Sequence, residues 1–327
     1  MDGATKITMQ GKASDKLSIG QLIGKYNLLV LLFAFIAIAG FLSPKFLTLQ
    51  NFLNLLQQSS VTGIMAIGMT FVIIVAGIDL SVGSVAAISG MVVAILITAG
   101  WGIPLSIVAA LAAGALLGWI NGYVSTKFTI PAFIATLAMM VSARGLALLV
   151  TNGKPVFGLP EPFSFLGAGF IGRVPVSGLI WIFLTICAAL ALKYTSFGRN
   201  LYAVGGNPEA AHLSGIRVNW HLVSVYVVSG ILSALAGIIL ASWLTVGQPT
   251  AAKGAELNAI AAVVLGGASL AGGSGGVWGT FAGVLLMSII TNIFNLVGLA
   301  SYYQDIFMGL IIVLALVLNK FVTGKKA

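Results

Sequence analysis

The chain alternates long apolar runs with short polar breaks, and this pattern sets its expected architecture. A helix needs about 20 mostly apolar residues to cross the hydrocarbon core of a bilayer. Ten runs approach that length, although the eighth is short and rich in glycine, which leaves counts of nine or eleven open. The expected fold is an all-α polytopic membrane protein with about ten transmembrane helices. The predicted spans are 27–43, 60–78, 84–100, 103–123, 130–150, 175–192, 221–244, 256–271, 276–298 and 304–321.

The composition makes the bilayer the expected solvent of this protein. Hydrophobic residues make up 59% of the chain and charged residues 7%, and the mean hydropathy is +1.10. A soluble domain carries about 25% charged residues. In a soluble protein the net charge of +9 would indicate a nucleic-acid partner. Here we attribute it to membrane topology, with lipid rather than nucleic acid as the surroundings.

The distribution of Lys and Arg predicts the orientation of the chain in the membrane. If the N-terminus is inside, the inside segments hold 11 of these residues and the outside segments 4, with Arg144 within a span. Cytoplasmic loops are enriched in Lys and Arg. We therefore expect cytoplasmic tails at 1–26 and 322–327, a transmembrane domain at 27–321, and a cytoplasmic loop at 193–219. The first tail carries no hydrophobic segment typical of a cleavable signal peptide.

One long polar segment, 193–217, interrupts the apolar runs, and within it 207–215 is predicted to form a short helix. Asn207 is a favoured N-cap residue. Glu209 complements the positive end of the helix dipole, and Gly215 is placed to adopt the left-handed conformation that ends a helix. A helix this short is marginal in water unless it packs on something. We infer that it docks on another protein; an ordinary capped loop is the alternative.

Five polar side chains are candidates for a translocation path. Asp79 lies between two apolar runs, with Ser81 and Ser84 close in sequence. Carboxylates within a membrane are costly and usually functional, so Asp79 either faces a polar pathway at a broken helix or caps a tight turn. Asn292 and Asn295 share one face of the ninth predicted helix. They either line the pathway or bond to a neighbouring helix.

A glycine pattern recurs in the two halves of the chain. The motif G-x-x-L-x-x-G-S occurs at 77–84 and again at 267–274, 190 residues later. Glycine-interrupted segments at corresponding places in two halves are a sequence pointer to the binding site of a transporter. The repeat is therefore a second, weaker indication of a transport path.

Four further features carry expectations about the outer side. The stretch 44–59 is mildly amphipathic and is expected along the outer interface. Residues 151–174 form the longest external loop, a docking surface for an external partner, and 248–257 is expected to be a polar external turn. Arg144 lies about four residues from the outer end of its span. Reaching the surface is favoured over a buried contact with substrate.

Several kinds of catalytic chemistry are absent from the sequence. No lysine is followed by Ser or Thr, so there is no phosphate-binding loop for ATP. His212 and His221 have no cysteine or carboxylate cluster to complete a zinc site. A proton-coupled carrier usually has a chain of buried carboxylates or histidines. We expect a non-catalytic subunit without cofactor or metal, powered from outside this polypeptide.

The motifs of the polar segment resemble those of a known family. The runs FGR at 197–199, GGN at 205–207, EAA at 209–211 and LSGI at 213–216 resemble the cytoplasmic loop of ribose-type sugar ABC importer permeases. The Leu-Pro that often follows in the wider family of import permeases is missing. DLSVGS at 79–84 and GGASLAGG at 266–273 are similar to motifs of the same sugar-importer family, and the similarity covers about 27–320.

The resemblance implies a function and partners. The chain would be the permease of an ATP-driven monosaccharide importer in the bacterial inner membrane, with ribose the leading substrate. It would form a homodimer with a second copy, driven by a cytoplasmic ATP-binding subunit and supplied by an extracytoplasmic sugar-binding protein. The alternatives are a self-sufficient secondary sugar carrier and a non-transport membrane protein. The residues expected to couple to the ATPase are Gly198, Arg199, Asn207, Glu209, Ala210, Ala211, Leu213 and Gly215.

Overall fold

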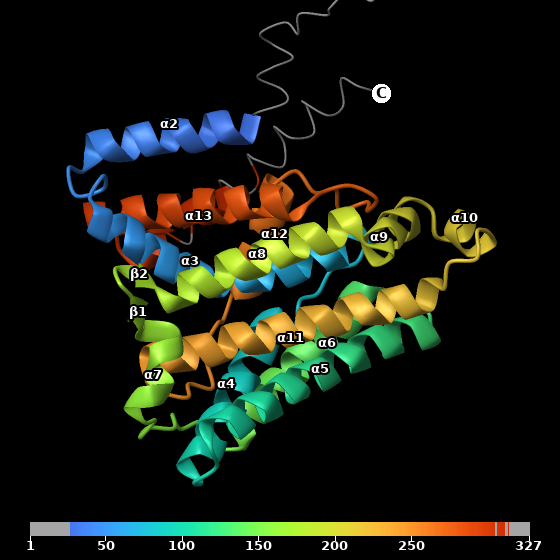
Figure 1. Ribbon diagram of the computed structural model, residues 1–327, viewed down its shortest axis with the longest axis horizontal. Helices are drawn as coiled ribbons and strands as arrows, with labels where there is room; N and C mark the ends of the chain where they lie inside the picture. Colours follow the sequence, from blue (N-terminus) through green and yellow to red (C-terminus); the bar gives the residue numbers. More distant parts are fainter. Residues whose placement is uncertain (1–26, 305, 311–312, 314–327) are drawn as a thin grey trace, which may run out of the picture.

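The computed structural model describes residues 27–304, 306–310 and 313, and they form a bundle of helices (Figure 1). Six of these helices are long and apolar enough to cross a membrane. They are α3 (Leu49–Ile74), α5 (Ile103–Lys127), α6 (Ala132–Leu149), α8 (Val176–Tyr194), α11 (Val218–Leu244) and α13 (Val277–Val297).

Shorter elements complete the bundle. Three further apolar helices are α2 (Asn27–Leu42), α4 (Val82–Thr98) and α12 (Ala255–Leu265). The outer loop folds into α7 (Glu161–Ala168) and an antiparallel pair of strands, β1 (Phe170–Ile171) and β2 (Val174–Pro175), in which Phe170 pairs with Pro175. The polar segment forms α9 (Ser196–Gly206) and α10 (Pro208–Leu213). Both lie beyond the end of α8, at one end of the bundle (Figure 1).

The structure does not confirm ten transmembrane spans. Nine of the ten predicted runs coincide with helices, but only six of these helices have the length to cross. The predicted span 256–271 is wrong, because α12 ends at Leu265 and its 11 residues extend only about 16 Å. Most of the span 304–321, together with the tails 1–26 and 322–327, lies outside the described residues.

One prediction about the outer side is also wrong. The stretch 44–59 does not lie along the interface as a separate segment, because 49–59 forms the first turns of α3. Its N-cap is Thr48, whose side chain accepts a hydrogen bond from the backbone of Asn51. Polar residues at the end of this stretch instead make contacts inside the protein. Ser59 and Ser60 are buried, and Gln57 donates to the Gly167 carbonyl of α7 at 2.8 Å.

Helix α11 lies at the centre of the fold, where it packs against α3, α4, α5 and α7. The contact with α5 depends on three glycines spaced one helical turn apart, Gly114, Gly118 and Gly122. A Cβ atom at Gly122 would lie 2.7 Å from Val223 Cα, and one at Gly118 would overlap the Tyr226 carbonyl. Small residues at this spacing allow the backbones of two membrane helices to approach closely.

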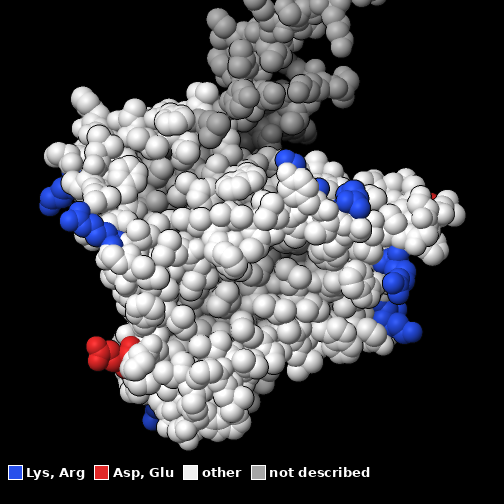
Figure 2. Space-filling model, viewed as in Figure 1, with Lys and Arg blue, Asp and Glu red and all other residues white. Residues whose placement is uncertain are grey.

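Most charged residues on the face shown in Figure 2 lie toward the two ends of the bundle. Figure 2 shows Lys and Arg gathered at the ends of the long axis, with a broad uncharged band between them. Large apolar side chains such as Phe183 and Val141 are exposed within the span helices. An apolar band between two charged rims is the surface expected of a protein embedded in a bilayer.

The glycine contact between α5 and α11 gives a test of the fold. Replacing Gly118 by Leu should push the two helices apart and lower the free energy of unfolding by about 1–3 kcal/mol, the usual cost of overpacking a core. The matched control is Gly145→Leu in α6, where an added Cβ meets nothing within 4 Å. The measurement is the melting temperature of the two variants in detergent. Equal melting temperatures would contradict close packing at Gly118.

Candidate functional site

The polar segment folds into two consecutive helices, one of which the sequence did not reveal. Helix α9 is capped by Thr195, whose side chain accepts a hydrogen bond from the Gly198 backbone at 3.2 Å. Gly198 lies where a Cβ would overlap the carbonyl of Leu192, so glycine lets α9 turn tightly away from α8. Arg199 is exposed and donates to Ser196 Oγ at 3.0 Å. The N-cap Thr195 before a small-residue turn was the available signal for α9.

Helix α10 has the ends that the sequence predicts. The Asn207 side chain accepts a hydrogen bond from the Ala210 backbone at 3.0 Å, which confirms Asn207 as the N-cap. Gly215 has φ of 83°, which confirms the left-handed residue after the helix. The Ile216 N–H donates to the Ala211 carbonyl at 3.0 Å, and the Gly215 N–H to the His212 carbonyl at 2.9 Å. This pair of bonds is the Schellman arrangement that closes a helix end.

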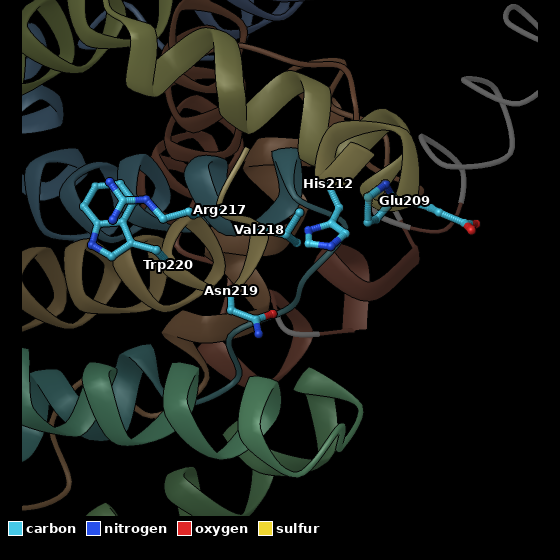
Figure 3. Close-up of a pocket in the computed structure, with 7 residues that line it drawn as sticks. Glu209, His212, Arg217, Val218, Asn219 and Trp220 are labelled. Carbon is cyan, nitrogen blue, oxygen red and sulfur yellow. The ribbon is translucent and has the colours of Figure 1, made fainter. Parts of the chain in front are cut away.

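The outer surface of α10 is left free by the rest of the described chain. Leu213 is 82% exposed, although its neighbour Ala211 is buried and Ala210 lies in the exposed first turn. A groove of about 610 Å³ lies beside the helix. Figure 3 shows Glu209 directed away from His212 and the rest of the lining. The groove is lined by Pro208, Glu209, His212, Arg217, Val218, Asn219 and Trp220.

Aromatic side chains fasten α9 to the start of α11. Phe197 contacts Trp220 at 6.0 Å between ring centroids and stacks on His221 at 5.8 Å. His221 is buried; its Nδ1 lies 2.9 Å from the Arg217 carbonyl and its Nε2 lies 3.2 Å from Asn200 Nδ2. Both ring nitrogens are therefore occupied by structural hydrogen bonds. Among the described residues there is no group of three or more His, Cys, Asp or Glu side chains that could hold a metal ion.

The inner face of α9 rests directly on two interruptions in the membrane helices. The first is the break between α3 and α4, and the second is the glycine-rich stretch 266–276 between α12 and α13. The Gly273 N–H donates to the Ile74 carbonyl at the end of α3, at 2.9 Å. Gly205 packs onto both of these groups, and Tyr202 Oη donates to the Gly275 carbonyl at 2.9 Å. The two segments that share the repeated glycine motif thus meet under α9.

Asp79 is enclosed within the bundle rather than exposed on its surface. Only 1% of this residue is accessible. Its Oδ1 accepts from the backbone N–H and the hydroxyl of Ser81, at 3.0 and 2.6 Å. Its Oδ2 accepts from Ser229 Oγ at 2.7 Å, and Asn121 donates to Ser81 Oγ at 2.9 Å. Asp79 therefore lies at a broken helix, between α3 and α4, where it ties that break to α5 and α11.

The remaining path candidates lie in different surroundings. Ser84 is buried in the first turn of α4. Asn292 exchanges two hydrogen bonds with Asn51, both at 3.0 Å, which join α13 to α3. Asn295 is exposed and accepts from Gln304 at 2.9 Å. The structure thus brings Asp79 and Ser81 together, while Ser84 lies one turn further on and Asn292 and Asn295 serve other contacts. A role of these five residues in transport stays a prediction.

Arg144 binds the backbone of a segment far away in the sequence. It is half-buried, and its Nη1 donates to the Pro249 carbonyl at 2.9 Å and to the Ala251 carbonyl at 2.7 Å. Both acceptors belong to the irregular stretch between α11 and α12. These carbonyls lie more than 100 residues further along the chain, so sequence could not reveal the contact. That Arg144 reaches the membrane surface stays a prediction.

Comparisons with known proteins agree with this architecture. Residues 51–316 match the family model described as "Branched-chain amino acid transport system / permease component". The ribose import permease protein RbsC of Haemophilus influenzae is 43% identical over 325 residues, which cover 97% of this chain and 100% of the relative. That of Escherichia coli K12 is 46% identical over 295 residues, covering 89% and 92%. That of Bacillus subtilis is 45% identical over 291 residues, covering 88% and 90%.

No solved structure matches the chain significantly. The match to the family model covers most of the chain, and each relative is matched over at least 88% of this chain and at least 90% of its own length. The resemblance to ribose-type permeases is thereby confirmed, as is the assignment to a multi-pass membrane protein. The chain belongs to the family of the branched-chain amino acid transport system permease component, within a group of relatives named ribose import permeases.

Proposed function

We propose that this chain is the membrane-spanning permease of an ATP-driven importer and that its cargo is a monosaccharide, with ribose first. The names of its relatives support the cargo. ATP hydrolysis belongs to a separate cytoplasmic subunit, since the sequence has no phosphate-binding loop. A sugar-binding protein outside the membrane supplies the substrate, and a second copy of the chain completes the pathway as a homodimer.

The observation that carries the proposal is the exposed helix α10 at one end of the bundle. Six residues are too few for a helix to be stable by itself. The caps at Asn207 and Gly215 hold it, yet Leu213 faces outward with 82% of its surface exposed. A helix too short to be stable by itself, with a large apolar side chain facing outward, is suited to contact with a partner protein. We assign this surface to a groove of the ATP-binding subunit.

The same end of the bundle is the cytoplasmic one in this proposal. Arg199 and Arg217 lie beside α10, Lys193 ends α8, and Lys127 ends α5, which follows the rule that cytoplasmic loops are rich in Lys and Arg. The opposite end carries α7 and the strands β1 and β2. We assign that folded outer loop to contact with the sugar-binding protein.

The packing under α9 offers a route by which α10 acts on the membrane helices. Helices α9 and α10 meet at Asn207, which ends the first and caps the second. Gly205, two residues earlier, contacts the Ile74 carbonyl and the Gly273 backbone. A displacement of α10 by a partner would therefore reach both helix interruptions through one rigid contact. Two distant sites are coupled when a structural element between them can adopt two arrangements and both sites influence which one it adopts.

The function is tested by uptake into proteoliposomes. The permease, reconstituted with its ATP-binding subunit and binding protein, should accumulate ribose only when ATP is supplied. ATP-independent accumulation by the permease alone under an ion gradient would instead identify a secondary carrier. No uptake of ribose or of other monosaccharides by the complete assembly would overturn the proposal.

Docking of α10 is tested by a double variant. Glu209→Arg with Gly215→Val should reverse a charge on α10 and strain a left-handed residue. Affinity for the ATP-binding subunit should fall at least about tenfold, which corresponds to roughly 1.4 kcal/mol. The measurement is co-purification of the two subunits. The matched control is Glu161→Arg with Gly158→Val in the outer loop, since Gly158 also has a positive φ, of 90°. Equal affinity of both variants would refute docking through α10.

The contact at Gly205 is tested against its neighbour in the same helix. Gly205→Ala should displace α9 from the Ile74 carbonyl, while Gly206→Ala should be tolerated because nothing lies within 4 Å of its added Cβ. The assembled Gly205→Ala complex should hydrolyse ATP but import ribose roughly tenfold more slowly, which amounts to about 1.4 kcal/mol of lost coupling. Identical uptake rates for the two variants would show that Gly205 does not transmit the movement.

A further inference from the structure

Four of the charged side chains that the structure describes lie between the two ends of the bundle, and three of them gather in one place. Asp79 is enclosed and fully bonded. Arg144, Lys253 and Glu256 meet around the irregular stretch 245–254 that joins α11 to α12. Charged groups at membrane depth are costly and usually serve a function. This second group of charges is not explained by docking of α10.

Helix contacts place the stretch well below the outer surface. Gly247, at its start, packs against Gly90 and Ala94 of α4. Ala252, five residues later, contacts Gly83 near the start of the same helix. Because a helix rises 1.5 Å per residue, the chain has moved inward along α4 by about 10–16 Å. Helix α12 therefore begins well inward of the outer end of α4, which we take to be membrane depth, whereas the sequence predicted 248–257 as a polar external turn.

Some backbone N–H and C=O groups in this stretch form hydrogen bonds with side chains. Arg144 binds the carbonyls of Pro249 and Ala251, and Glu256 Oε1 accepts from the Gly254 N–H at 3.2 Å. The other oxygen of Glu256 is buried against α4 without a hydrogen-bond partner. Irregular backbone at membrane depth is tolerated only where protein buries it or where it lines a water-filled cavity.

The outward side of the stretch carries three polar side chains together with Leu257, which is 59% exposed. Thr250, Lys253 and Asn258 are all exposed, although they lie on the segment that has entered the membrane region. A lysine at membrane depth is not expected to face lipid tails. The exposed surface of this segment is therefore expected to contact water or polar protein rather than lipid hydrocarbon.

We propose that the exposed side of residues 248–258 lines the water-filled route of the sugar, with Thr250, Lys253 and Asn258 facing the cargo. This inference rests on the proposed function of the chain as a monosaccharide importer. Hydroxyl, ammonium and amide groups provide both the donors and the acceptors that a neutral polyhydroxyl ligand needs. Arg144 acts as a positioning residue, because its hydrogen bonds go to backbone carbonyls and hold the segment in its irregular form.

The route is tested by the accessibility of introduced cysteines in the full chain assembled with its partner subunits in proteoliposomes. Cys187, the single native cysteine, is exposed and is first replaced by Ala. Thr250→Cys, Lys253→Cys and Asn258→Cys are then compared with Val141→Cys and Phe183→Cys, whose native side chains are each 64% exposed on the apolar surface of α6 and α8. The probe is a charged methanethiosulfonate reagent.

The three path cysteines should react at least about tenfold faster than the two controls, because the reactive thiolate forms in water and not in lipid. Reaction rates equal to those of the controls would overturn the route. The same conclusion would follow if the three cysteines in the assembled dimer did not react with the reagent, with or without ATP. If ribose uptake by the Cys187→Ala protein persists in that case, only the route fails. If the cysteines react but no sugar is imported, the proposed function fails instead.

The positioning role of Arg144 has its own readout. Arg144→Ala should release the segment and reduce the reactivity of Lys253→Cys toward that of the Val141→Cys control. Arg144→Lys, which keeps a donor, should restore part of it. A melting temperature measured on each variant separates this effect from general unfolding. Unchanged reactivity of Lys253→Cys in the Arg144→Ala background would show that Arg144 does not hold the segment.

Discussion

The structure depends on the need to satisfy backbone hydrogen bonds within the protein, because lipid offers none. The described chain breaks its helical pattern in three places that are packed among other helices, at 75–81, 245–254 and 266–276. In each, the polar groups freed by the break find a specific partner. The Ile74 carbonyl accepts from Gly273, Asp79 accepts from the backbone of Ser81, and Arg144 binds the carbonyls of Pro249 and Ala251.

This constraint explains why glycines gather where the breaks meet. Partners for backbone groups are often other backbones, and two backbones approach within hydrogen-bonding distance only where no Cβ intervenes. Gly205 lies against both Ile74 and Gly273, and Gly83 lies against Ala252 and Glu256. The close contacts join elements that would have to move together in the proposed ATP-driven transport. Glycines thus have two uses in this fold. Some allow irregular segments to pack closely, and others allow helix pairs such as α5 and α11 to approach each other.

The sequence predicted features that depend on neighbouring residues and missed those that depend on distant ones. The ends of α10 followed from Asn207 and Gly215 because capping acts within a few residues. The start of α3 was missed because its polar residues have distant partners in the sequence. Gln57, for example, donates a hydrogen bond to α7, more than 100 residues later. The length of α12 was misjudged because hydropathy cannot distinguish a spanning helix from one that begins at depth. The family motifs, in contrast, identified the class correctly.

Charges at depth divide into two kinds, and the division separates structural from functional candidates. Asp79 was a path candidate by sequence, yet both its carboxylate oxygens accept hydrogen bonds from neighbours, so it holds α3, α4 and α11 together. Lys253 was not among the path candidates, yet it is exposed, three residues before Glu256, which has a buried carboxylate oxygen without a hydrogen-bond partner. A polar group already satisfied has little to offer a sugar hydroxyl. A polar group exposed at depth needs water or cargo, and this need places the route beside α12.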